Sequence, residues 1–170
     1  MSRRPTPKAG QTVHITVRCN NKEYLFHLNE NYSDFVSMFN FLPLFFNVEL
    51  HHIVFMSNHI HFLATPTENN FGKALSYLLT NLSRFLNGKN QRVNHIFGSR
   101  YYPSVIENEN YLRNVIRYLY QNPVRSSIVS NVCEYPYSSI FHYLGEKNDG
   151  MIIKPDLFTE NCFQKGLAGR

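Results

Sequence analysis

Two histidines separated by one residue, His59 and His61, form the pattern in this sequence with the most direct chemical meaning. They lie in a stretch rich in β-forming residues, and side chains two positions apart on a strand point to the same face. The two imidazoles would therefore project together, about 6–7 Å apart at the backbone, which suits two ligands of one metal ion. Ile60, Phe62 and Ala64 would pack against helices on the opposite face. The histidines would then occupy an open face of the sheet that a substrate can reach.

Tyr118 and Asn122 form a second candidate constellation, because residues four apart on a helix lie one above the other. Arg113 and Arg117 would line the exposed side of the same helix. A phenol beside an amide and several arginines could attack a phosphate. A purely structural interpretation is also open, with Tyr118 as an aromatic residue at the edge of the core and Asn122 as the helix cap before Pro123.

A metal site with two histidines needs a third ligand, and few carboxylates are near. Glu49 and Glu68 flank the histidine segment, but the pattern does not place them on its ligand face. His52 would share the face of His59 and His61, further along the preceding strand. It could orient a ligand or touch DNA, and an ordinary polar strand residue is the simpler interpretation.

The elements that must position these residues can be read from hydrophobic periodicity and turn signals. Strands are expected at Thr12–Arg18, 47–56, 59–65 and 94–106, with Ser57 and Asn58 as the turn of a hairpin. Helices are expected from a cap at Ser33 to Pro43, over Phe71–Leu86 with Gly88 beyond its end, and from a cap at Asn108 or Asn110 to Asn122, where Pro123 would end it. This order predicts an α+β domain in which helices back one antiparallel sheet.

Length and composition limit the class of protein. The chain has 170 residues, 43% of them hydrophobic, which favours one globular domain and excludes disorder throughout. We expect a flexible basic arm at 1–11, a domain at 12–145 and a tail at 146–170 that packs on the domain or extends it. No apolar run approaches the roughly 20 residues that span a bilayer. Three scattered cysteines, Cys19, Cys133 and Cys162, suggest reduced thiols and a cytoplasmic protein.

The charges favour a polyanionic partner. Seventeen Lys and Arg face 12 Asp and Glu, a net charge of +5, and the excess falls in the first 22 residues and between Arg84 and Arg125. Eleven tyrosines and 14 phenylalanines offer aromatic surface on which nucleic-acid bases could stack. A generic basic surface remains the alternative, because a charge of this size is not specific.

Several segments resemble a known family. Met56–Leu63 (MSNHIHFL) resembles the "MPNHVHLL" block of the single-tyrosine HUH transposases, the IS200/IS605-like family. Tyr118–Val129 (YLYQNPVRSSIV) resembles that family's "YIHxNPVRAGLV" block, particularly in the branch associated with repetitive extragenic palindromes (REP). Val13–Phe26, His95–Ile106 and Tyr135–Gly145 resemble three further blocks in the family's order, so the likeness covers most of the chain.

The resemblance implies a ferredoxin-like antiparallel sheet, the HUH fold, and assigns roles by motif position. His59 and His61 match the metal-binding histidines, and Tyr118 matches the nucleophile. Asn122 falls where the family places its third metal ligand, although the insertion-sequence branch usually has Gln there. Tyr120 is the competing phenol, but it aligns with the His of "YIHxNP".

The implied function is a metal-dependent transposase that uses Mg²⁺ or Mn²⁺. It would cleave and rejoin single-stranded DNA near hairpins through a 5′-phosphotyrosine. Departures from the family's blocks, such as Ser57 in place of Pro, remove no candidate catalytic group. A domesticated, non-catalytic protein that binds hairpin DNA on the same fold is the main alternative. A metal hydrolase of small phosphoesters, which would not need Tyr118, is a third.

The expected partner is single-stranded or hairpin DNA, with no membrane. Candidate DNA-binding residues are Arg18, Arg100, Arg117 and Arg125 within the domain, and Arg4 and Lys8 on the arm. Family members of the insertion-sequence type act as dimers, whereas the palindrome-associated branch can act as a monomer, so the resemblance leaves both a homodimer and a monomer open for this chain. The resemblance also implies a prokaryotic, nucleoid-associated protein of the cytoplasm.

Overall fold

A four-stranded antiparallel sheet forms the centre of the molecule, in a computed structural model that describes residues 6–97, 101–146, 149–156 and 159. Its strands are β1 (Val13–Arg18), β2 (Val48–Phe55), β3 (His59–Pro66) and β4 (Tyr102–Val105), in the spatial order β2-β3-β1-β4. The helices are α1 (Leu28–Phe45), α2 (Phe71–Lys89), α3 (Glu109–Arg125) and α4 (Ile140–Leu144), with short 3₁₀ turns η1 (Asn20–Lys22) and η2 (Val132–Glu134). The predicted α+β class, with helices backing one antiparallel sheet, is confirmed.

The β2–β3 hairpin has the register that its sequence predicts. Val54 pairs with His61, and the Met56 N–H donates to the His59 carbonyl across the turn. An irregularity between Leu50 and His52 interrupts the pairing on β2, so that an extra residue bulges from the strand. Pairing with β3 on one side and β4 on the other makes β1 a central strand.

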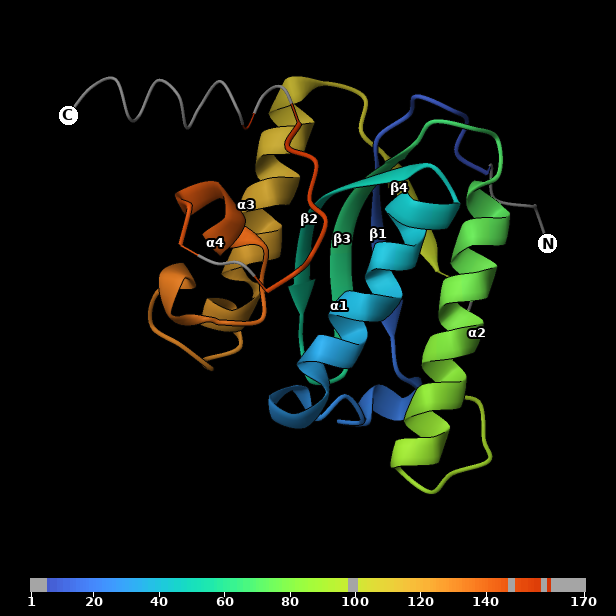
Figure 1. Cartoon of the computed structure of the whole chain (residues 1–170). Coiled ribbons are helices and arrows are strands. Elements are labelled where there is room, and N and C mark those ends of the chain that lie inside the picture. The colour runs from blue at the N-terminus through green and yellow to red at the C-terminus, as the bar shows by residue number, and fades with distance from the viewer. Residues whose placement is uncertain (1–5, 98–100, 147–148, 157–158, 160–170) are drawn as a thin grey trace.

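Helices cover both faces of the sheet. Alternate residues of the strands, including Ile15, Ile60 and Phe62, form the main core with α1 and α2. On the other face, Leu119 of α3 packs with Val54 of β2 in a smaller cluster. Figure 1 shows α1 and α2 together and α3 beside β2. The expectation that the histidine face is open is therefore wrong, because α3 lies over it.

The first helix begins earlier and ends later than its sequence predicts. It starts at Leu28, where Asn31 donates its side-chain N–H to the Phe26 carbonyl, and Ser33 lies inside it. Pro43 does not end the helix. A proline removes only its own N–H from the hydrogen-bond ladder, and one turn from the end the Phe46 N–H still donates to the Leu42 carbonyl.

The other two long helices also continue past their predicted ends. Gly88 lies within α2, which reaches Lys89. The third helix is capped by the Asn108 side chain, which accepts from the Tyr111 N–H, and it passes through Pro123 to Arg125. In the described part of the expected extended stretch 94–106, the strand is the short β4, and Phe97 forms an isolated bridge with Cys19.

Described residues of the arm and the tail contact the sheet. The Gly10 N–H donates to the carbonyl of Pro66 at the end of β3. In the tail, the Lys154 N–H donates to the Leu50 carbonyl, and Met151 is buried in the main core. Among the helices described, none is both long enough and apolar enough to cross a membrane.

The core packing leads to a first prediction. Phe55 is fully buried on β2. Its ring stacks on Phe35 and meets Phe39 edge to face. Replacing it should leave a cavity, so Phe55→Ala is expected to lower the free energy of unfolding by about 3–5 kcal/mol. The control is Phe45→Ala, because Phe45 is 67% exposed, and it should cost less than about 1 kcal/mol. Urea unfolding measures both, and equal losses would contradict this account of the core.

Candidate active site

His59 and His61 lie side by side on β3, beneath α3. Their ring centroids are 4.9 Å apart, and the rings meet edge to face. The residues are only 8% and 2% exposed, respectively, because α3 covers the face from which they project. Alternation along β3 therefore places the two side chains together as predicted. They lie in a buried site between the sheet and α3.

Hydrogen bonds hold both imidazoles by the same ring atom. Nδ1 of His59 lies 2.6 Å from Oδ1 of Asn58, and Nδ1 of His61 lies 3.0 Å from Oγ1 of Thr16 and 3.2 Å from Nε2 of His14. The Nε2 atoms of both His59 and His61 are buried and have no hydrogen-bond partner in the described structure. Buried polar atoms without partners are costly, so this pair of nitrogens fits the position of two metal ligands.

Burial keeps the paired imidazoles neutral. It lowers the pKa of His61 to about 2, with further lowering by the positive charges that His59, His14 and Arg18 can carry. It also lowers the pKa of His59 to about 4. The positive charge of Arg18 lowers this pKa further, whereas a polar interaction with the Asn122 side chain raises it. A neutral imidazole keeps the lone pair that a metal ion requires.

Tyr118 of the same chain lies at the mouth of this site. Its ring centroid is 5.5 Å from that of His61 and 6.4 Å from that of His14. The guanidinium carbon of Arg125 lies 5.5 Å from the Tyr118 ring centroid. Tyr118 is 39% exposed, so a large substrate can reach the phenol while the imidazoles stay buried behind it.

Asn122 lies one helical turn after Tyr118 and is nearly buried. Its side-chain N–H donates to the Tyr118 carbonyl at 3.0 Å, which leaves the amide oxygen as the atom able to bind a cation. Across the described ranges, no three His, Cys, Asp or Glu side chains form a metal cluster. Glu49 instead pairs with Lys154 at the surface. The Asn122 side chain interacts with His59, so its amide oxygen is the candidate for a third ligand beside the two imidazoles.

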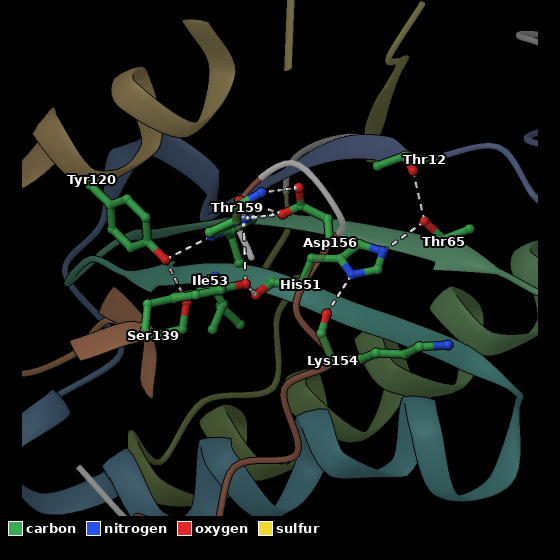
Figure 2. A network of polar contacts seen from close by, with 11 residues as sticks. Thr12, His51, Ile53, Thr65, Tyr120, Ser139, Lys154, Asp156 and Thr159 are labelled. Carbon is green, nitrogen blue, oxygen red and sulfur yellow. Dashed lines mark hydrogen bonds and ion pairs between the residues drawn. The ribbon is translucent and has the colours of Figure 1, made fainter. Parts of the chain in front are cut away.

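Tyr120, the competing phenol, belongs to a different environment. Its hydroxyl lies 2.8 Å from Nδ1 of His52 and 3.0 Å from Oγ of Ser139, inside the polar network of Figure 2. Burial raises the pKa of Tyr120. Both Tyr120 and His52 therefore lie outside the candidate site.

The predicted basic residues are only partly brought together. Arg18 is the last residue of β1, directly opposite His59, and Arg117 and Arg125 are exposed on α3. Lys8 lies in a turn near Pro66, at the end of β3 far from His59, so it does not join this group. Arg4 and Arg100 lie outside the described residues.

Three residues that hold the imidazoles were missed by sequence reasoning. His14 and Thr16 share one face of β1 through strand alternation, but their contact with His61 depends on the pairing of β1 with β3. Asn58 precedes His59 in the predicted turn, and nothing in the pattern gives its side chain a role. The alternation in Thr12–Arg18 was the available signal for the first two.

The fold and the site together define a class of protein. It has an antiparallel sheet with a pair of histidines on a central strand, and a helix places a tyrosine against that pair. The family model for IS200-like transposases matches residues 8–122, and the chain belongs to this family. The matched region includes all four candidate catalytic and metal-binding residues, His59, His61, Tyr118 and Asn122.

Individual relatives agree with the family. A protein of Haemophilus influenzae named as a REP-associated tyrosine transposase is 33% identical over 101 residues, an alignment that covers 53% of this chain and 57% of the relative. A solved structure of a REP-associated tyrosine transposase bound to a REP hairpin is 19% identical, covers 92% of each chain and superposes with a TM-score of 0.67. The structural likeness supports the fold.

The buried histidines should make stability depend on pH. His14, His59 and His61 have a lowered pKa in the folded chain, so between about pH 4 and 6.5 the unfolded chain binds more protons than the folded one. The free energy of unfolding in the absence of metal should therefore fall from pH 7.5 to pH 5. Each additional proton contributes a slope of about 1.4 kcal/mol per pH unit.

Urea unfolding at pH 7.5, 6.5, 5.5 and 5.0 measures this slope. The control variant His61→Asn removes one of the titrating groups and should show a shallower dependence. Equal stability of the parent chain at pH 7.5 and pH 5 would show that these imidazoles are not held neutral by burial.

Proposed function

We propose that the chain is a metal-dependent transposase that cleaves and rejoins single-stranded DNA near hairpins, with Tyr118 as the nucleophile. The observation that carries the proposal is the contact of Tyr118 with His61 in one chain, at 5.5 Å between ring centroids, beside two buried Nε2 atoms without partners. Family membership supports the reaction class. A single chain contains every group that the proposal requires.

His59, His61 and Asn122 would hold the divalent ion. Two neutral imidazoles and an amide oxygen would form a mixed nitrogen and oxygen set; we propose Mn²⁺ or Mg²⁺ as the ion, and the two imidazoles favour Mn²⁺, the transition-metal ion of the two. When bound there, such an ion would polarise the scissile phosphate and stabilise the negative charge that develops on it. Asn58 and Thr16 would keep each Nε2 aimed at the ion through their hydrogen bonds to the opposite ring nitrogens.

The exposed phenol of Tyr118 would attack the scissile phosphorus in line with the leaving oxygen. The phenolic proton passes to solvent, a bond forms between the tyrosine oxygen and phosphorus, and the bond from phosphorus to the 3′ oxygen breaks. The 3′ oxygen takes up a proton and leaves as a hydroxyl. Because the phosphotyrosine ester retains the bond, attack by another 3′-hydroxyl reverses the step and rejoins DNA without a nucleotide cofactor.

The surface around Tyr118 suits a DNA strand. Arg18, Arg117 and Arg125 surround the site on β1 and α3 and could neutralise phosphates. The solved relative with this fold is bound to a REP hairpin, which supports a palindromic hairpin as the proposed substrate. The acidic residue of α3, Glu109, lies in its first turn, at the opposite end of the helix from Arg125.

A covalent adduct provides the direct test. Incubation with a pool of 3′-labelled hairpins carrying randomised flanks, in Mn²⁺ or Mg²⁺, should give a labelled protein band in denaturing gels, and EDTA should abolish it. Tyr118→Phe should remove the adduct, because the attacking oxygen is lost. The control Tyr111→Phe changes a tyrosine on the same helix with nearly the same exposure, 38% against 39%, and should keep it.

The same assay separates the alternatives. His61→Ala should abolish the adduct, and Tyr120→Phe should still form it. An adduct that survives in Tyr118→Phe but disappears in Tyr120→Phe would overturn the assignment of the nucleophile. Hairpin binding that is unaffected by EDTA, with no adduct in any metal, would instead support a non-catalytic DNA-binding protein.

The DNA surface gives a prediction of its own. Arg117→Gln should weaken hairpin binding about 3–10-fold. It should also reduce the magnitude of the slope of log K against log salt by about 1, the value for one lost phosphate contact. The control Lys73→Gln removes an equal charge from an exposed position on α2, a helix that packs on the other face of the sheet. Fluorescence anisotropy from 50 to 300 mM salt measures both. Equal effects would show that binding follows net charge alone.

A further inference from the structure

A buried polar network lies on the other flank of α3, and the proposed mechanism does not use it. His52 of β2 is fully buried at its centre. Its Nδ1 lies 2.8 Å from the Tyr120 hydroxyl, and its Nε2 lies 2.7 Å from Oδ2 of Asp156 and 3.2 Å from Oγ1 of Thr159. The ring of Tyr143 stacks on the imidazole with centroids 4.7 Å apart. Four separate segments of the chain therefore meet at one histidine.

The chemistry of the partners sets the direction of these hydrogen bonds. The Asp156 carboxylate can only accept, so Nε2 of His52 carries the proton and donates to it. Nδ1 is then an acceptor, and the Tyr120 hydroxyl donates to it. Ser139 can donate to the Tyr120 oxygen because its own oxygen accepts from the Ile53 N–H. Figure 2 shows the Tyr120 and Ser139 end of this chain of bonds and the Asp156 segment.

The network holds α3 on the side away from the candidate site. Successive helical residues are about 100° apart, so Tyr120 points to nearly the opposite side of the helix from Tyr118. Leu119, between them, packs on the sheet. A roll of α3 by about 10° about its axis would move an atom about 6 Å from that axis by about 1 Å. Displacements of that size at a reacting group can reduce a rate about 100-fold.

We infer that His52 is a positioning residue for the proposed transesterification: by accepting the Tyr120 hydroxyl hydrogen bond, it fixes the rotation of α3 that places Tyr118 and Asn122 against the histidine pair. The inference rests on the proposed function. Asp156 acts one step further away, because its hydrogen bond to Nε2 selects the His52 tautomer that can accept from Tyr120. Neither residue touches the reacting atoms.

The first test is a comparison of two phenol deletions. Tyr120→Phe removes the hydroxyl that donates to His52 and leaves the ring. Tyr32→Phe removes a hydroxyl on α1 that donates to Asp149, on the other face of the sheet. Tyr120→Phe should slow single-turnover adduct formation at saturating hairpin at least 10-fold. The Kd for the hairpin should change less than 2-fold in both variants, and the rate should change less than 2-fold in Tyr32→Phe.

A pair of substitutions at His52 tests the acceptor itself. His52→Leu removes it, and His52→Asn places an amide oxygen close to the position of Nδ1. His52→Asn should recover most of the rate that His52→Leu loses, measured on folded protein at a temperature well below the Tm of either variant. Equal rates in the two variants, or equal losses in Tyr120→Phe and Tyr32→Phe, would overturn the inference.

Two measurements do not require activity. Nitrogen-15 spectra of the imidazoles at pH 7 should show His52 protonated at Nε2, and Asp156→Ala should mix the two tautomers. Amide hydrogen exchange along α3 should be at least 10-fold faster in Tyr120→Phe than in Tyr32→Phe. An unprotonated Nε2, or unchanged exchange, overturns the positioning role even if the parent chain forms no adduct. Absence of the adduct together with the expected spectra and exchange would count against the proposed function alone.

Discussion

The packing of α3 across the histidine face of the sheet is the contact on which the candidate site depends. Leu119 packs with Val54 in a small cluster that is separate from the main core. The same helix places Tyr118 against His61 and Asn122 against His59, and burial lowers the pKa of each imidazole. Without α3 the same two side chains would be solvated histidines on a strand. The docking of α3 on the sheet through a small apolar cluster is therefore linked to the neutral state of the two imidazoles.

Residues of one helix, α3, contact two different polar sites because they point in different directions. Tyr118 and Asn122, one turn apart, face the histidine pair, whereas Tyr120 reaches the network around His52 on the other flank. Unpartnered buried nitrogens are costly, and in the described structure the candidate site carries a pair of them, at Nε2 of His59 and His61. That cost is consistent with a site completed by a cation, as we propose. The hydrogen-bonded flank, where every ring nitrogen has a partner, contrasts with it.

Local patterns predicted most of the secondary structure, and their errors share a physical cause. Strand alternation and the two-residue turn predicted the hairpin with the pairing of Val54 and His61. Pro43 and Pro123 were expected to end helices, but each lies near a C-terminus, where the loss of one N–H costs little and tertiary packing stabilises the last turn. The irregularity on β2 has no local signal in the sequence, and it lies next to His52, which contacts Asp156 of the tail.

The sequence by itself determined that His59 and His61 share a face and that Tyr118 and Asn122 lie one above the other, because both follow from the periods of a strand and a helix. Its resemblance to a family joined the two pairs. Only the tertiary structure decided that the pairs meet within one chain, that His14 and Thr16 hold His61, and that Asp156 reaches His52. These contacts join residues 45 to 104 positions apart. They depend on strand order and helix docking, and no local periodicity encodes either.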